Sequence, residues 1–225
     1  MGEYTVDILA VSFFVIEWSV YAFTLERTSY GRDSLSARMH AYRERWIRRV
    51  LDRDARMVDM QIMISLQNGT AFFASTSLLA IGGGLALLRS TTDALTVLSK
   101  LPVDISPTPA LWEMKCVGLM LIFVYTFFKF AWSYRLFNYV CILLGAMPPS
   151  SERGTEEAEA HVIRTTRLFE SGGRHFNRGQ RAFFFALGYL GWFVSPWVLF
   201  VTTALVVVVI WRRQFASSAW SAMGA

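Results

Sequence analysis

Residues 111–145 read LWEMKCVGLMLIFVYTFFKFAWSYRLFNYVCILLG, a stretch without proline in which apolar side chains dominate. A helix of this length would measure about 50 Å, whereas the hydrocarbon core of a bilayer is about 30 Å thick. The stretch therefore predicts a membrane-spanning helix that projects well beyond the bilayer.

Three other apolar runs are also long enough to cross a bilayer, at about 6–25, 70–88 and 182–210. The chain has 225 residues, 54% of them hydrophobic. A soluble domain of this size would not need unbroken apolar runs of such length. We therefore expect an all-α integral membrane protein, a single membrane domain over residues 1–225 with four transmembrane helices.

Arginine is concentrated in two loops between the predicted spans. The first loop holds nine arginines, from Arg27 to Arg56, and the second holds six, from Arg153 to Arg181. Loops rich in Lys and Arg stay on the cytoplasmic side of a membrane. This distribution predicts a cell (inner) membrane protein with both termini outside, although Arg212 and Arg213 after the last span oppose that orientation.

Both arginine-rich loops contain predicted helices. Residues 36–66 have no proline or glycine and are rich in good helix formers, so we expect one helix there, interrupted if anywhere at QNGT, 67–70. Residues 151–170 read as a second helix, capped by Ser151 or Thr155. Together they form a predicted helical, arginine-rich cytoplasmic extension.

Charged side chains within the predicted spans are the main candidates for function. Lys129 would lie about 18–20 Å from the outer face and Glu17 about 16 Å from the same face. A lone charge at this depth costs at least about 3 kcal/mol, so we expect the two side chains to pair. The pair is either a structural clamp or part of a solute pathway, which Arg135, Ser75 and Ser77 would then line. Lys129 reaching the interface is the other structural alternative.

Residues 172–181 read GGRHFNRGQR and combine glycines with several basic side chains. If a helix starts here, its N-terminus and Arg174, Arg178 and Arg181 would form an anion site. Anionic lipid headgroups are the nearest anions, and a bound phosphate or a permeating anion is the alternative.

Three blocks of the sequence resemble a known family: FFASTSLLAIGG (72–83), FKFAWSYRLFNY (128–139) and HFNRGQRAFFFAL (175–187). They are similar to the membrane family known as domain of unknown function 599, found in bacteria and plants. The resemblance implies a multi-span membrane protein and carries no assigned activity. It also implies that six residues belong to the family's pattern: Lys129, Arg135, Asn138, Asn177, Arg178 and Arg181.

The sequence shows no recognisable motif for binding a cofactor or a metal, or for catalysis. The two cysteines are not in a CxxC pair, and the three histidines lie outside the predicted spans. No HExxH, P-loop or GxSxG motif occurs. We expect no cofactor, no metal and no catalytic residue. The membrane already explains the basicity, so no nucleic-acid partner is expected.

These observations favour an oligomeric channel or transporter-like protein for a small ion or solute, with basic residues biasing it toward an anion. The expected partners are anionic membrane lipids and either identical copies or other subunits of a membrane complex. A non-catalytic accessory or scaffold subunit is the alternative. A membrane enzyme without a recognisable motif is third.

Overall fold

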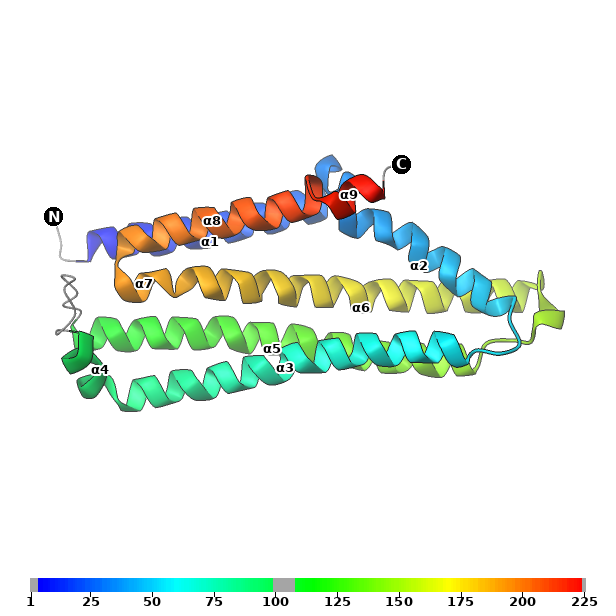
Figure 1. The fold of residues 1–225 in the computed structure, drawn as a ribbon, viewed down its shortest axis with the longest axis horizontal. Coiled ribbons are helices and arrows are strands. Elements are labelled where there is room, and N and C mark those ends of the chain that lie inside the picture. The colour runs from blue at the N-terminus through cyan, green and yellow to red at the C-terminus, as the bar shows by residue number, and fades with distance from the viewer. Residues whose placement is uncertain (1–3, 99–107, 224–225) are drawn as a thin grey trace. The chain divides into compact units, whose positions relative to one another are not determined.

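The computed structural model describes residues 4–98 and 108–223, and every regular element in those ranges is helical (Figure 1). The predicted all-α class is therefore confirmed. The longer helices are α1 (Thr5–Arg27), α2 (Leu35–Leu51), α3 (Met57–Arg89), α5 (Pro109–Gly145), α6 (Glu156–Tyr189) and α8 (Pro196–Phe215). The shorter ones are η1 (Ser29–Asp33), α4 (Thr91–Leu98), η2 (Ser150–Glu152), α7 (Gly191–Val194) and α9 (Ser218–Ala222).

Four helical stretches are long and apolar enough to cross a membrane: Thr5–Arg27, Met57–Arg89, Pro109–Gly145 and Pro196–Ala222. In the apolar window of α3 only 11% of the residues are buried, and in that of α1 17%. So many outward-facing apolar side chains would be unfavourable in water, whereas a lipid-facing helix carries them at no such cost. The helices are thus consistent with the predicted membrane protein.

The chain divides into two compact units that share α3, α5 and α6. The first unit comprises Met1–Leu35, Ser77–Tyr125 and Arg181–Ala225, and the second comprises Ser36–Thr76 and Thr126–Gln180. Each has its own apolar core. That of the first unit includes Phe14, Phe123, Phe185, Tyr189 and Leu199. That of the second includes Ile47, Met63, Phe137, Val140 and Phe169.

Helix α5 is one uninterrupted helix of 37 residues, as the sequence predicts. Proline at its first position fits, because the missing N–H would have no intrahelical partner there. At 1.5 Å per residue the helix is about 55 Å long.

The predicted helix over 36–66 is divided in the structure, and 52–56 form a turn between α2 and α3. The turn is fixed by packing within the second unit. The carboxylate of Asp59, which is 1% exposed, accepts a hydrogen bond of 2.6 Å from Nε1 of Trp46 on α2. α3 then continues without interruption through QNGT, 67–70.

The second arginine-rich loop is more regular than its sequence suggests. α6 starts at Glu156 and runs through 170–181 to Tyr189. Thr155, rather than Ser151, caps it, since Oγ1 of Thr155 accepts a hydrogen bond of 3.2 Å from the backbone N–H of Ala158.

The predicted fourth span, 182–210, is not one helix. The chain leaves α6 after Tyr189, forms α7 and starts α8 at Pro196. Ser195 is extended (φ −165°, ψ 161°), as a residue before proline prefers, and its Oγ accepts from the N–H of Val198. The hydroxyl of Thr202 on α8 donates to the carbonyl of Gly188 on α6 at 2.7 Å. The chain therefore reverses its direction within the stretch that the sequence predicts to be one span.

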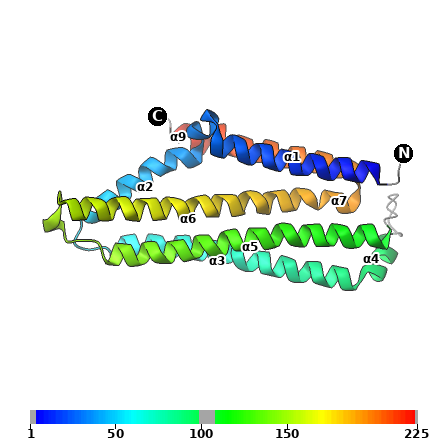
Figure 2. The same cartoon turned by 180° about the vertical axis from the view of Figure 1, so that it is seen from behind.

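Helices α1 and α8 lie side by side and run in the same direction (Figures 1 and 2). The rings of Phe13 and Phe200 are 5.1 Å apart, and further along both helices those of Tyr21 and Trp211 are 6.4 Å apart. If both helices cross a membrane, their C-terminal ends emerge on the same side. The expectation that both termini face outside therefore does not fit the first unit.

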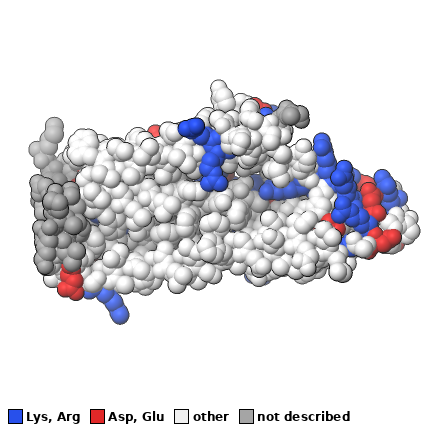
Figure 3. Space-filling model, in the orientation of Figure 1, with Lys and Arg blue, Asp and Glu red and all other residues white. Residues whose placement is uncertain are grey.

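Charged side chains gather over the end of the second unit that contains the α2–α3 turn and η2 (Figure 3). The ion pairs at this end include those of Arg48 and Arg153: Nη1 of Arg48 is 2.8 Å from Oε2 of Glu159, and Nε of Arg153 is 3.2 Å from Oδ1 of Asp52. Such exposed pairs stabilise a fold by only about 0–1 kcal/mol each. They are significant mainly because they indicate that this end is in contact with water. We interpret this end as facing water.

Candidate anion-binding site

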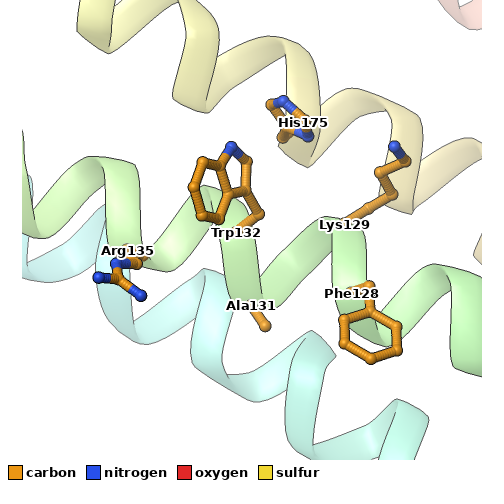
Figure 4. Close-up of a pocket in the computed structure, with 6 residues that line it drawn as sticks. All are labelled: Phe128, Lys129, Ala131, Trp132, Arg135 and His175. Atoms are coloured by element: carbon orange, nitrogen blue, oxygen red, sulfur yellow. The ribbon is translucent and has the colours of Figure 1, made fainter.

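A pocket of about 470 Å³ opens in the second unit, where α5 and α6 meet (Figure 4). Five lining residues come from α5 and one from α6. They are Phe128, Lys129, Ala131, Trp132, Arg135 and His175. Two of them, Lys129 and Arg135, are candidates from the sequence, and the structure brings them to one pocket.

Close packing of α5 and α6 beneath the pocket depends on glycines of α6. A Cβ at Gly179 would lie 2.9 Å from the ring of Phe130, and one at Gly172 would lie 2.8 Å from that of Phe137. The hydroxyl of Ser133 donates to the carbonyl of Gly172 at 2.8 Å. Small residues that let backbones approach are typical of membrane helix contacts. Here they fix α5 and α6 at the depth of the pocket.

The guanidinium of Arg135 is held in place by aromatic side chains. Its Nε donates to the hydroxyl of Tyr139 at 2.7 Å. Its Cζ lies 6.0 Å from the ring centroid of Trp132 and 5.6 Å from that of Tyr139, both within the range of cation–π attraction. Within the described ranges, neither Nη group of Arg135 makes a hydrogen bond, so both remain available to a ligand.

Lys129 and His175 supply the other polar groups of the pocket. Lys129 is half-buried, and its side chain extends from α5 toward α6 (Figure 4). The imidazole of His175 on α6 lies 6.4 Å from the ring of Trp132. None of the six lining residues is acidic. Two basic side chains and an imidazole beside aromatic rings make a site suited to an anion that also has an apolar part.

The other sequence candidates for a pathway do not line this pocket. Ser75 is exposed and Ser77 is buried, because residues two apart on a helix point in different directions. Glu17 is half-buried on α1 in the first unit, whereas Lys129 belongs to the second. Their pairing therefore stays a prediction.

The basic residues of 172–181 lie in the middle of α6, so the expected helix start is wrong. The glycines that suggested it serve the contact with α5 instead. Nη1 of Arg174 is 3.8 Å from Oε2 of Glu170. Arg181 forms an ion pair with Glu26 on α1 in the first unit. Arg178 is half-buried. Binding of a lipid headgroup by these three arginines stays a prediction.

Two of the six residues of the family's pattern have packing roles in the second unit. The side-chain oxygen of Asn138 accepts a hydrogen bond of 2.6 Å from Nε2 of Gln67 and so joins α5 to α3. The side-chain nitrogen of Asn177 donates to the hydroxyl of Ser36 at 3.3 Å and so joins α6 to the start of α2.

A titratable cluster joins α2 to α6 in the second unit. Nδ1 of His40 lies 3.5 Å from Oε1 of Glu170. Burial lowers the pKa of His40 below its usual value, and the charge of Arg43 lowers it further, while Glu170 acts in the opposite direction. His40 is therefore held mainly in its neutral form at neutral pH.

Sequence reasoning missed a buried polar cluster in the first unit. The indole N–H of Trp192 donates to Oδ1 of Asp7 at 2.6 Å, and Nζ of Lys115 lies 5.4 Å from the ring centroid of Trp192. Lys115 is 3% exposed, and Asp7 interacts with it electrostatically. Both charges lie near the ends of predicted spans, where sequence reasoning expects contact with water. The signal was the pair of opposite charges at matching ends of two spans.

The sequence did not predict that His175 lines the pocket. Residues 172–181 were expected to contain the start of a helix, whereas in the structure they lie within α6, which faces α5. In the described residues, no group of three or more His, Cys, Asp or Glu side chains could hold a metal ion.

Comparisons with known proteins give one match. A family model described as "Protein of unknown function, DUF599" matches residues 9–219, nearly the whole chain. No curated protein and no solved structure matches the chain.

Proposed function

Because the chain belongs to the DUF599 family of proteins of unknown function, its role has to be inferred from its own residues, and we propose that it is an oligomeric membrane protein that moves a small anion. The observation that carries this proposal is the pocket beside α5. Lys129, Arg135 and His175 line it without any acidic neighbour among the lining residues.

The position of these cations supports a functional role. Lys129 and Arg135 belong to a helix that is long and apolar enough to span a membrane. A charged residue in such a helix costs about 3 kcal/mol or more, and a bound anion is one of the groups that can offset this cost. The competing explanation is a structural ion pair between Lys129 and Glu17. The two explanations predict different effects on transport when Lys129 is made neutral.

We propose that the protein lies in the inner membrane. In the proposed orientation, the arginine-rich α2 and the start of α6 lie in the cytoplasm. The N-terminus then lies outside. Since α1 and α8 run in the same direction (Figure 1), the C-terminus lies inside, and this requires α6 to cross the membrane as well, in addition to the four apolar helices. Arg212 and Arg213 agree with this orientation instead of opposing it. A reporter protein that works only in the cytoplasm should therefore be active when it is fused to the C-terminus.

Oligomer formation is proposed on the outer surface of α3. A Cβ added at Gly69, Gly82 or Gly83 would meet no atom within 4 Å. Glycine within a helix costs about 0.5–1 kcal/mol relative to alanine, so open glycines on a membrane helix favour a close contact with another helix. Light scattering of the purified protein in detergent would give the number of copies.

Transport is tested with the purified chain in liposomes. We expect uptake of labelled chloride, acetate or inorganic phosphate, reduced at least about tenfold by Lys129→Met, which removes a charge that binds the anion. Arg89→Met is the matched control, because Arg89 is exposed at the end of α3 and does not line the pocket. Equal uptake by wild type and Lys129→Met would remove Lys129 from the pathway.

A second candidate function is that of a non-catalytic subunit of a larger membrane complex. It is favoured by an exposed stripe on α5, in which Phe128, Trp132, Tyr139 and Ile142 follow one another at spacings of four, seven and three residues. Another chain could cover such a stripe. Absence of uptake for every anion, together with stable recovery only alongside foreign subunits, would favour this candidate.

A further inference from the structure

We propose that the ligand of the α5 pocket is an anionic phospholipid, with its phosphate bound at Arg135, its negative charge attracted also by Lys129, and an acyl chain lying along Phe128 and Trp132. This inference rests on the proposed anion site and names the class of molecule that fills it. It is carried by the charge of the pocket, by the chemistry of its walls and by the side from which it opens.

The polar part of the pocket fits a phosphate. Arg135 presents its two Nη groups while Nε is bonded to Tyr139. A guanidinium fixed in this way can bind two phosphate oxygens at once, whereas the Lys129 ammonium contributes a point charge. His175 adds a third group from α6. Basic pockets between membrane helices bind lipid headgroups on this principle.

The remaining walls fit a hydrocarbon chain. Phe128 is 65% exposed and Trp132 is 47% exposed, and both line the pocket. A small inorganic anion would leave these apolar faces uncovered. The acyl chain of a bound lipid would lie along both of them.

The pocket opens toward the exterior of α5 rather than into a core. Phe128 and Trp132 belong to the exposed stripe of this helix, which continues to Tyr139 and Ile142. In a helix that spans a membrane, such a stripe is in contact with lipid. The ligand can therefore enter sideways from the bilayer, with its headgroup already at the depth of the cations.

The test compares soluble short-chain lipids that differ only in charge. The full-length chain in a neutral detergent is titrated with dioctanoyl-phosphatidylglycerol, dioctanoyl-phosphatidylcholine and inorganic phosphate, and binding is measured by calorimetry. We expect the anionic lipid to bind about tenfold more tightly than the zwitterionic one. Lys129→Gln should remove this difference, and Arg89→Gln should keep it.

Phe128→Ala separates the lipid from a free anion. Because Phe128 is largely exposed, this variant should fold even if Lys129→Gln does not. It should weaken phosphatidylglycerol about tenfold, by loss of a wall of the acyl site, and leave inorganic phosphate unchanged. Equal binding of the two lipids, or no effect of Phe128→Ala, would overturn the inference.

The two proposals can fail separately. If inorganic phosphate binds as tightly as phosphatidylglycerol, the pocket serves free anions, and the lipid inference fails while the anion site stands. If phosphatidylglycerol binds as expected but no anion is taken up into liposomes, the transport proposal fails and the lipid site stands.

Discussion

Trp192 donates a hydrogen bond of 2.6 Å to Asp7, and both side chains are buried in the first unit. The bond connects α7 to the start of α1, residues that are far apart in the sequence. It also satisfies one oxygen of the Asp7 carboxylate, which interacts electrostatically with Lys115. A buried carboxylate without such partners would be strongly unfavourable.

Trp192→Phe should destabilise the protein by about 1–3 kcal/mol, because the Asp7 oxygen loses its donor while the aromatic packing is kept. The measurement is the free energy of unfolding in mixed micelles. Trp197→Phe is the control, since Trp197 is 68% exposed. Equal stability of the two variants would mean that the bond contributes little.

Asp7→Asn and Lys115→Met should together cost less than the sum of their separate effects. Each single change leaves one charge buried without its counterpart, and the double change removes both. We expect a coupling of about 0.5–3 kcal/mol in a double-mutant cycle. Strict additivity would show that the two charges do not act on each other.

Gly179→Ala should destabilise the second unit by about 1–3 kcal/mol, because the new Cβ would overlap the ring of Phe130. That ring cannot easily move, since it is buried and stacked on Phe73. Gly145→Ala makes the same chemical change on open surface at the end of α5 and should stabilise the chain by up to about 0.5–1 kcal/mol. Thermal unfolding of both variants checks the opposite signs.

Acidification should weaken the second unit through His40. Its pKa is lowered in the folded chain, so the unfolded chain binds more protons. Its contribution to stability is therefore complete above about pH 6.5 and declines as the pH falls below that value. Arg43, Glu170 and Arg174 are the charged groups that act on it. His40→Gln should flatten the stability profile between pH 7.5 and 5, and an unchanged profile would assign the titration to another group.

The predicted pair of Glu17 and Lys129 can be tested by reversing both charges. Glu17→Lys and Lys129→Glu should each reduce the yield of folded protein, since each places like charges together. The double variant should recover much of the loss. If it is no better than the single variants, the two residues do not pair.

Much of the fold follows from the sequence, because long apolar runs allow few alternatives. The helical class and the unbroken α5 were predicted correctly. The reversal before Pro196 was missed, since apolar residues lie on both sides of it and hydropathy carries no direction. The turn at 52–56 was missed because it depends on distant partners, such as the bond from Trp46 to Asp59.

The candidate site was predicted in part for similar reasons. Lys129 and Arg135 are conspicuous as charges within an apolar run. His175 comes from another helix, and only the packing of α6 on α5 brings it to the pocket. Asp7 and Lys115 were not recognised as a cluster, because burial at the end of a span cannot be seen without its neighbours.

The hydrogen bond from Arg135 to Tyr139 also affects how selective the pocket can be. The guanidinium has already lost most of its rotamer freedom when the chain folds, so a ligand need not order it again. Lys129, with its four-carbon stem, has more ways to adapt. Arg135 would thus discriminate between ligands by shape, and Lys129 would accept any negative charge within its reach. Replacing Arg135 by lysine should therefore broaden the range of anions bound more than it lowers the affinity for any one of them.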